Sequence, residues 1–106
     1  MTFDEIVSGV RSAASGIDVS GQAPFAVQIN LTGEGGGVFY VAVKDGKISV
    51  EPYEYNDRDC AITISSEDFM KLAQGKLDPI FAFTMGRLKV DGDIGKALEF
   101  SKIIKK

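Results

Sequence analysis

The stretch near the end of the chain, residues 81–104, constrains the fold more than any other. It reads FAFTMGRLKVDGDIGKALEFSKII. Leu88 and Val90 alternate with polar residues, as in a half-buried strand, and Gly92 and Asp93 supply a turn and a helix cap. The stretch therefore predicts a strand, a turn and a helix. Both elements are too apolar to be stable alone, so the rest of the chain must supply a partner layer.

This stretch also resembles a known motif. Residues 83–94, FTMGRLKVDGDI, are similar to the closing signature of the sterol carrier protein 2 domain family. In that signature a strand and turn of the form Gly-Lys/Arg-Leu-Lys-Val/Ile-x-Gly-Asn/Asp lead into the last helix. The order of the elements upstream extends the resemblance over nearly the whole chain. The resemblance implies an α+β fold with a five-stranded mixed sheet in the order 3-2-1-4-5, whose helices pack on one face and enclose an apolar cavity.

Alternating apolar residues predict three antiparallel strands behind an N-terminal helix. A capping box at Thr2 and Glu5 opens the helix. Residues 25–31 alternate strictly, a glycine-rich loop separates them from residues 38–44, and Asp45-Gly46 is a hairpin turn before a third strand. The expected apolar pairs across these strands are Leu31 with Phe39, Ile29 with Val41, Val41 with Val50, and Val43 with Ile48.

The middle of the chain predicts a crossover, a fourth strand and two short helices. Pro52 ends the third strand, so the acidic segment 53–59 must cross the sheet. Residues 60–64 alternate again as a strand. A pair of serines then caps a helix that Gly75 stops, and an Asp-Pro pair opens a second helix that runs to Gly86.

Composition predicts one globular domain over residues 1–106, since 44% of the residues are hydrophobic and 25% are charged. The chain has no His, and Cys60 is its only Cys, which argues against a metal site and most general-base chemistry. We therefore expect no enzyme and no cofactor; a hydrolase that uses carboxylates alone is the weakest alternative. No stretch approaches the roughly 20 apolar residues of a membrane span, and we recognise no targeting segment, so we expect a cytoplasmic protein.

The resemblance implies noncovalent binding and transfer of fatty acids, fatty acyl-CoA or other long apolar lipids in an internal hydrophobic tunnel. The wall residues that it implies are Phe81, Phe83, Met85, Leu88, Val90, Ile94 and Leu98. The expected facing of the first helix and first strand adds Ile6, Val10, Ala14, Phe25, Val27 and Ile29. A second interpretation is an accessory module that presents an apolar groove, or a bound lipid, to a partner such as a lipid-metabolising enzyme.

Arg11 is our candidate for the group that meets a ligand carboxylate. It is the only basic residue among the first 43, and its planar guanidinium suits a carboxylate. The alternatives are that Arg11 faces solvent without a partner, or that Arg87 is the anchor.

Charge limits the partners. The net charge of −3 argues against nucleic acid, whose binding depends on neutralising phosphates. From Arg87 to the end the chain carries six basic and three acidic residues. This basic end predicts either transient contact with an anionic membrane surface or a solvated helix with lysines at its C-terminus.

Overall fold

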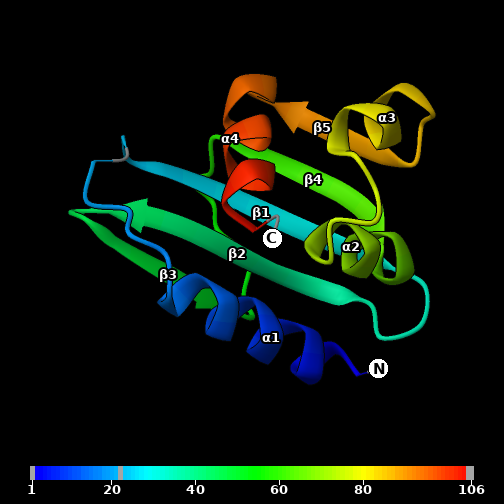
Figure 1. Cartoon of the computed structure of the whole chain (residues 1–106), viewed down its shortest axis with the longest axis horizontal. Coiled ribbons are helices and arrows are strands. Elements are labelled where there is room, and N and C mark those ends of the chain that lie inside the picture. The colour runs from blue at the N-terminus through cyan, green and yellow to red at the C-terminus, as the bar shows by residue number, and fades with distance from the viewer. Residues whose placement is uncertain (1, 22, 105–106) are drawn as a thin grey trace.

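The computed structural model describes residues 2–21 and 23–104. Its elements in chain order are α1 (Phe3–Ser15), β1 (Phe25–Thr32), β2 (Gly37–Lys44), β3 (Lys47–Glu51), β4 (Cys60–Ser65), α2 (Ser66–Ala73), α3 (Pro79–Thr84), β5 (Leu88–Gly92) and α4 (Ile94–Ile104). The strands form one mixed sheet in the order β3-β2-β1-β4-β5, and the helices lie on one face of it (Figure 1). The predicted fold class is therefore confirmed.

The register of the sheet confirms the two apolar pairs predicted between β2 and β3 and corrects the two predicted between β1 and β2. Val41 and Val43 of β2 lie opposite Val50 and Ile48 of β3, as predicted. Ile29 and Leu31 of β1, however, lie opposite Phe39 and Gly37 instead of Val41 and Phe39, because Gly37 belongs to β2 and the glycine loop is therefore shorter than predicted. The register shifts by two residues, so each side chain keeps its face of the sheet, and both strand pairs are antiparallel. β4 runs parallel to β1, so the chain must cross the sheet between β3 and β4. β5 then adds to β4 in the antiparallel sense and forms the other edge.

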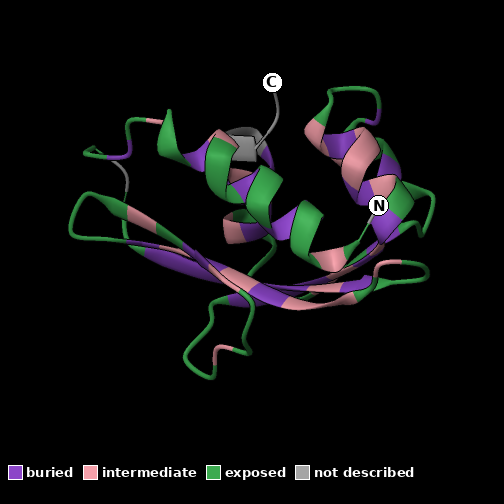
Figure 2. Cartoon of the chain, turned by 90° about the horizontal axis from the view of Figure 1, so that it is seen from below, coloured by how far each residue is buried: buried purple, intermediate pink, exposed green. Residues whose placement is uncertain are grey.

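The crossover, residues 52–59, covers part of the sheet face that the helices leave free (Figure 2). The Tyr55 ring packs against Tyr40 of β2, with ring centroids 4.8 Å apart. The Tyr55 N–H donates to the side-chain oxygen of Gln28 at 3.2 Å, and the Gln28 amide donates to Asn30 at 3.0 Å. The buried Gln28 is thus hydrogen-bonded, as a buried polar group must be.

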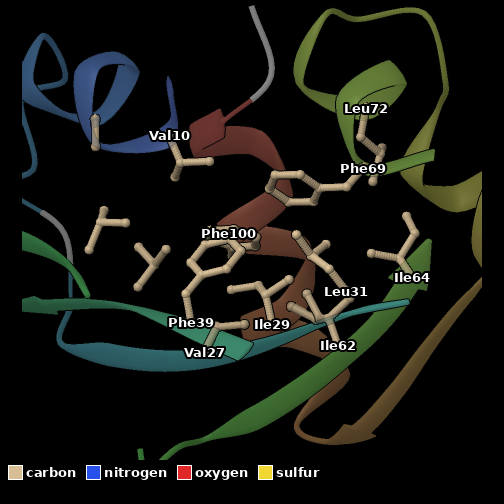
Figure 3. Packing of buried hydrophobic residues seen from close by; sticks show 14 of the residues in the cluster. Val10, Val27, Ile29, Leu31, Phe39, Ile62, Ile64, Phe69, Leu72 and Phe100 are labelled. Atoms are coloured by element: carbon tan, nitrogen blue, oxygen red, sulfur yellow. The ribbon is translucent and has the colours of Figure 1, made fainter. Parts of the chain in front are cut away.

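A single hydrophobic core lies between the helices and the sheet (Figure 3). Phe39 of β2 is its centre, because its ring lies edge-on to Phe3 of α1 at 6.2 Å and to Phe69 of α2 at 5.8 Å. Phe100 brings α4 into the same cluster. Each of the four helices contributes to this core, so none of them is stable without the sheet.

Strands β1, β4 and β5 and helix α4 meet at Asp59. The Asp59 N–H donates to the Ala26 carbonyl at 2.8 Å, its carboxylate accepts from the Ala26 N–H at 2.8 Å, and its carbonyl accepts from the Asp93 N–H at 3.1 Å. Gly92 sits beside this junction with φ 105°. A Cβ at Gly92 would lie 2.7 Å from the Asp59 carbonyl oxygen and 3.0 Å from the Cys60 Cα, so no other residue fits.

We predict that Gly92→Ala lowers the free energy of unfolding by about 2 kcal/mol or more, because the new Cβ meets backbone atoms and φ is strained. Gly9→Ala is the matched control. Gly9 lies inside α1, and a Cβ there meets nothing within 4 Å, so this change should raise stability by about 0.5–1 kcal/mol. Urea unfolding measures both, and an unchanged midpoint for Gly92→Ala would contradict the account.

Candidate functional site

An apolar pocket of about 220 Å³ lies between α3, α4 and the strands β4 and β5. Its lining presents no polar surface. The lining residues are Ile62, Pro79, Ile80, Phe83, Leu88, Val90, Ile94, Ala97, Leu98 and Ser101. Ser101 is the one residue of this set with a hydrogen-bonding side chain, and its hydroxyl donates to the Leu98 carbonyl at 2.8 Å.

Local sequence places each wall of the pocket. In the sheet, Leu88 and Val90 lie opposite Ile64 and Ile62, so strand alternation directs all four toward the helices. Asp78 caps α3 by accepting from the Ile80 N–H at 2.8 Å. Asp93 caps α4 in the same way, by accepting from the Lys96 N–H at 3.2 Å. The caps fix where both helices begin, and therefore which of their residues face the strands.

The pocket is closed at one end and apolar at its mouth. Ile62, Ala97 and Ser101 are buried and form the closed end. Ile80, Phe83 and Ile94 both line the pocket and remain 42–62% exposed to solvent. A molecule in the pocket would therefore pass between apolar side chains on its way out.

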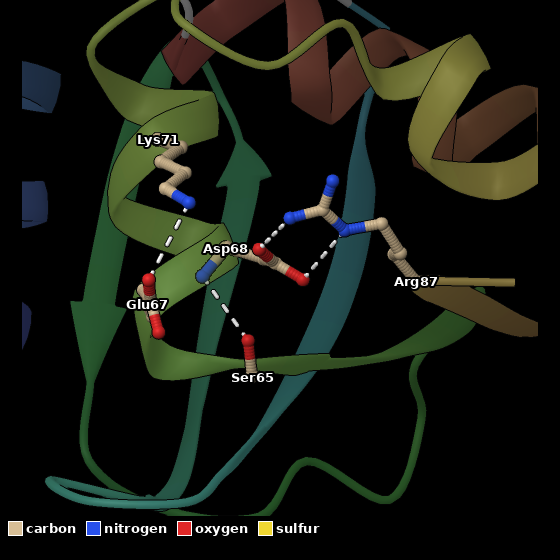
Figure 4. Close-up of polar contacts among 5 residues, drawn as sticks. All are labelled: Ser65, Glu67, Asp68, Lys71 and Arg87. Atoms are coloured by element: carbon tan, nitrogen blue, oxygen red, sulfur yellow. Dashed lines mark hydrogen bonds and ion pairs between the residues drawn. The ribbon is translucent and has the colours of Figure 1, made fainter. Parts of the chain in front are cut away.

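An ion pair between Arg87 and Asp68 connects the turn before β5 with α2 (Figure 4). The Arg87 Nε donates to Asp68 at 3.2 Å, and its second nitrogen donates to the other carboxylate oxygen at 2.5 Å. The hydrogen bonds from Arg87 lower the pKa of the Asp68 carboxyl, against the opposing effect of burial. Arg87, the alternative carboxylate anchor, thus already binds a carboxylate of this chain through its Nε and one terminal nitrogen.

Arg11 lies apart from the pocket. Its guanidinium donates to the Val50 carbonyl of β3 at 2.8 and 3.2 Å and approaches the Glu51 carboxylate at 3.8 Å. The expectation that it faces solvent without a partner is wrong. Its donors are directed at the edge strand, on the opposite edge of the sheet from β5.

The other predicted wall residues fall into three groups. Phe83, Leu88, Val90, Ile94 and Leu98 line the pocket described above. Ile6 and Val10 line a second pocket, of about 200 Å³, between α1 and α2. The remainder lie in neither lining: Ala14, Phe25, Val27 and Ile29 are buried in the core, whereas Phe81 and Met85 are exposed.

Sequence reasoning missed five residues of the lining. Ile62 was detectable, since the alternation of β4 and the pairing of β4 with β5 put it opposite Val90. Pro79 and Ile80 belong to a segment that is apolar on every side, so no periodicity shows which residues face the strands. Ala97 and Ser101 are small residues, and the sequence carries no signal that distinguishes them from ordinary helix positions.

Two further features, a hollow near α2 and the Cys60 thiol, do not form a binding or catalytic site. A hollow of about 340 Å³ at the start of α2 is lined by both polar and apolar residues. Glu34 and Glu67 are among them, and their negative charge disfavours an anion there. Burial, and then the charges of Asp59 and Asp93, raise the pKa of the Cys60 thiol to about 11, so it remains protonated and unreactive at neutral pH.

Residues 2–21 and 23–104 contain neither a metal-binding cluster nor a membrane-spanning helix. No group of three or more His, Cys, Asp or Glu side chains in this part of the chain is placed to hold a metal ion. None of the helices in it has the length and apolar character to span a membrane.

Asp68→Asn should lower stability at neutral pH and lose its effect in acid. Because the pKa of Asp68 is lowered in the folded state, its charge stabilises the fold above the usual pKa, and this contribution is lost as the pH falls through the lowered value. The urea midpoints of wild type and variant should differ at pH 7 and converge once the pH has fallen below the lowered pKa of Asp68. Lys96→Gln, which removes a partly exposed pair with Glu99 on α4, is the control. A constant difference at every pH would contradict this role.

Arg11→Ala should act on stability rather than on ligand choice. We expect a loss of about 0.5–1 kcal/mol, since the half-exposed guanidinium leaves the Val50 carbonyl without its donor. Affinities for a fatty acid and for the matching fatty alcohol, measured by calorimetry, should change by the same small factor. A selective loss for the acid would make Arg11 a carboxylate anchor after all.

Comparison with known proteins identifies a matching family and two similar proteins. The profile of the SCP-2 sterol transfer family matches residues 11–105. Human sterol carrier protein 2 is 40% identical over 73 residues, which cover 67% of this chain and 13% of that protein. Rat hydroxysteroid dehydrogenase-like protein 2 is 37% identical over 78 residues, which cover 73% of this chain and 15% of that protein. The chain thus spans a small part of these relatives.

The fold agrees with a solved structure. The solution structure of palmitated SCP2L2 from Aedes aegypti matches with a TM-score of 0.75 at 19% identity, and the match covers 100% of this chain and 96% of that one. At 19% identity the structural similarity supports only a shared fold, whereas the family profile and the two relatives support common ancestry. The chain belongs to the SCP-2 sterol transfer family.

Proposed function

We propose that this protein binds fatty acids, fatty acyl-CoA or similar long apolar lipids noncovalently and transfers them. The observation that carries the proposal is a pocket without polar surface, closed at one end, whose mouth is itself apolar. Such a pocket suits a hydrocarbon chain, because only burial of apolar surface is gained there. In this proposal Phe83, Leu88, Val90, Ile94 and Leu98 contact the chain.

The polar end of the ligand stays outside the pocket. Burial of an unpaired carboxylate costs several kcal/mol or more, and the lining offers no donor. Only the hydrocarbon chain therefore enters, with its free end toward Ile62, Ala97 and Ser101. A bulky head group such as coenzyme A is tolerated for the same reason.

The volume of the pocket adds a second expectation. At about 220 Å³ it lies below the roughly 300–1,000 Å³ typical of sites for drug-sized ligands. A long chain must therefore extend past the mouth or displace α3. That helix has six residues, and Gly75 and Gly86, both with positive φ, precede and follow it, so it is the part of the wall that moves most easily.

Hydrophobic burial is sufficient for useful affinity. Sixteen methylenes at about 0.8 kcal/mol each give roughly 13 kcal/mol gross, whereas micromolar binding requires about 8 kcal/mol after the cost of ordering the ligand. The relatives support this ligand class, since the matching insect protein was solved in palmitated form and the family is described as sterol transfer.

One comparison favours a second candidate. The matched segment makes up only 15% of hydroxysteroid dehydrogenase-like protein 2, so this type of domain occurs beside a much longer remainder. The domain would then present a bound lipid, or its apolar groove, to a partner enzyme. A delipidated sample separates the two candidates, because a carrier takes up free acyl chains and a pure docking module does not.

Leu98→Trp tests the pocket directly. The larger side chain fills the space between α4 and β5, so we expect palmitate affinity to fall by about tenfold or more, with unfolding free energy changed by less than about 1.5 kcal/mol. Wild-type protein with ligand at about 100 times its dissociation constant should gain about 2.7 kcal/mol of stability. Tyr53→Ser, an exposed change outside the lining, is the control and should bind as wild type.

The test has a clear negative result. If palmitate, palmitoyl-CoA and cholesterol all leave the melting temperature of a delipidated sample unchanged, the carrier function is wrong. Equal palmitate affinity for wild type and Leu98→Trp would place the ligand elsewhere.

A further inference from the structure

We infer that the ion pair between Arg87 and Asp68 decides how bulky a lipid the pocket accepts, because it holds the last turn of α3 in place. The inference rests on the proposed lipid-binding function and narrows its ligand class to lipids with a slim, unbranched hydrocarbon chain, as opposed to a fused ring system. It follows from the way in which α3 is attached to the rest of the domain.

Helix α3 has little packing of its own. Of its six residues only Ala82 is buried, whereas its three large apolar side chains are 42–62% exposed. In the described part of the chain, the hydrogen bonds of residues 78–86 are all made within the segment 78–87. An element with few buried contacts and only local hydrogen bonds opens at low cost in free energy. Helix α3 therefore depends on attachments from outside itself.

The chain before α3 is anchored through its backbone. Leu77 is buried, and its N–H donates to the Lys71 carbonyl in the last turn of α2 at 3.2 Å. The Lys76 N–H donates to the same carbonyl at 2.8 Å. The first turn of α3 therefore keeps its place, so that movement of the helix is concentrated in its last turn, which carries Phe83.

The last turn of α3 is attached to α2 through Arg87. The Arg87 N–H donates to the Ala82 carbonyl at 2.9 Å, and the Arg87 side chain binds both carboxylate oxygens of Asp68 (Figure 4). Asp68 is a fixed point, because its side chain is 13% exposed and the next residue, Phe69, is packed in the core. The ion pair thus connects the loosely packed end of α3 with a firmly packed helix.

Outward movement of this turn would enlarge the pocket. Phe83 belongs to the pocket wall, together with Ile94 and Leu98 of α4. With the ion pair in place the pocket has about 220 Å³. An unbranched chain can fill this space and leave its remainder outside the mouth, whereas a rigid fused ring system must enter whole. Such a ligand requires α3 to move and the Arg87–Asp68 pair to break.

The cost of this movement falls on one ligand class. The apparent affinity of a ligand that needs the displaced helix is reduced by the fraction of molecules in that state, whereas a ligand that fits the undisplaced pocket is unaffected. Two charge-assisted hydrogen bonds between Arg87 and Asp68 make the displaced state rarer. The ion pair therefore selects against ring lipids without contacting the ligand.

Two fluorescent lipids test the selection. Parinaric acid is an unbranched chain, and dehydroergosterol is a fused ring system. Arg87→Gln should raise the affinity for dehydroergosterol about threefold to tenfold and change that for parinaric acid by less than about twofold. Asp68→Asn should have the same effect. The double variant should gain nothing further, since either change breaks the same pair.

Two controls separate the ion pair from loss of charge and from loss of stability. Lys89→Gln removes the same charge from β5, where Lys89 is exposed and pairs with no carboxylate in the part of the chain that the structure describes. Arg11→Ala removes a contact at the opposite edge of the sheet. Neither should change the ratio of the two affinities. An equal change in a control, or an unchanged ratio in Arg87→Gln and Asp68→Asn, overturns the proposal.

Amide hydrogen exchange follows α3 without any ligand. In Arg87→Gln the amides of residues 81–84 should exchange about threefold to tenfold faster, relative to those of β4, than in wild type. The comparison with β4 excludes a general loss of stability, which would accelerate both elements. Equal relative exchange in wild type and variant overturns the proposal, because the ion pair then does not hold the helix.

The two proposals fail separately. Wild-type protein that binds parinaric acid, with an affinity ratio that Arg87→Gln and Asp68→Asn leave unchanged, overturns the role of the ion pair and leaves the carrier function intact. If wild type and variants bind neither lipid, the carrier function is refuted, and the exchange of α3 still decides whether the ion pair holds the helix.

Discussion

The contact between Gly92 and Asp59 is the constraint on which the rest of the site depends. Because Gly92 has no Cβ, the Asp59 carbonyl can approach closely enough to accept the Asp93 N–H, and Asp93 then caps α4. The same Asp59 holds the start of β1 through both its backbone and its carboxylate. One residue without a side chain thus fixes where β5 ends and where α4 crosses the sheet, and these two elements form most of the pocket.

The apolar residues of the domain fall into two groups, those that pack the core and those that line or surround the pocket. Phe39, Phe69 and Phe100 fill the space over β1 and β2, where the helices and the sheet are in full contact. Over β4 and β5 the short helix α3 leaves the pocket, and its apolar side chains remain at the surface. More of the fully buried strand residues therefore lie in β1 and β2 than in β4 and β5, where the pocket leaves space for a ligand.

The sequence predicted the sheet better than the site. Strict alternation determines which face each strand residue occupies, so Ile29 lies on the core face as expected, and the pair of Val41 and Val50 was correct. Alternation does not fix the length of the glycine loop, and for this reason the partner of Ile29 is Phe39 rather than the predicted Val41. Alternation does not show whether the space next to a core-facing side chain is packed with other side chains or left open as a pocket. For this reason Val27 was expected at a wall, although the structure buries it in the core.

The helices limited the prediction in two further ways. The periodicity of α1 shows that Arg11 lies off the apolar stripe, but only the tertiary structure brings the Val50 carbonyl to it. In α3 every side is apolar, so its sequence cannot distinguish Phe83, which lines the pocket, from Phe81, which does not. By contrast, five of the seven residues that the family resemblance named line the pocket, because a strand, a turn and a helix in succession fix their spacing.

Methyl NMR with selective isotope labelling tests the central claim most directly. The delipidated protein is titrated with palmitate, and the shifts of the methyl groups of Leu88, Val90, Ile94 and Leu98 are compared with those of Val27 and Val41 in the core and of Ile6 and Val10 between α1 and α2. Our account predicts large, saturable shifts and ligand nuclear Overhauser effects at the first group only. Shifts confined to the pocket between α1 and α2, or none at all, would contradict it.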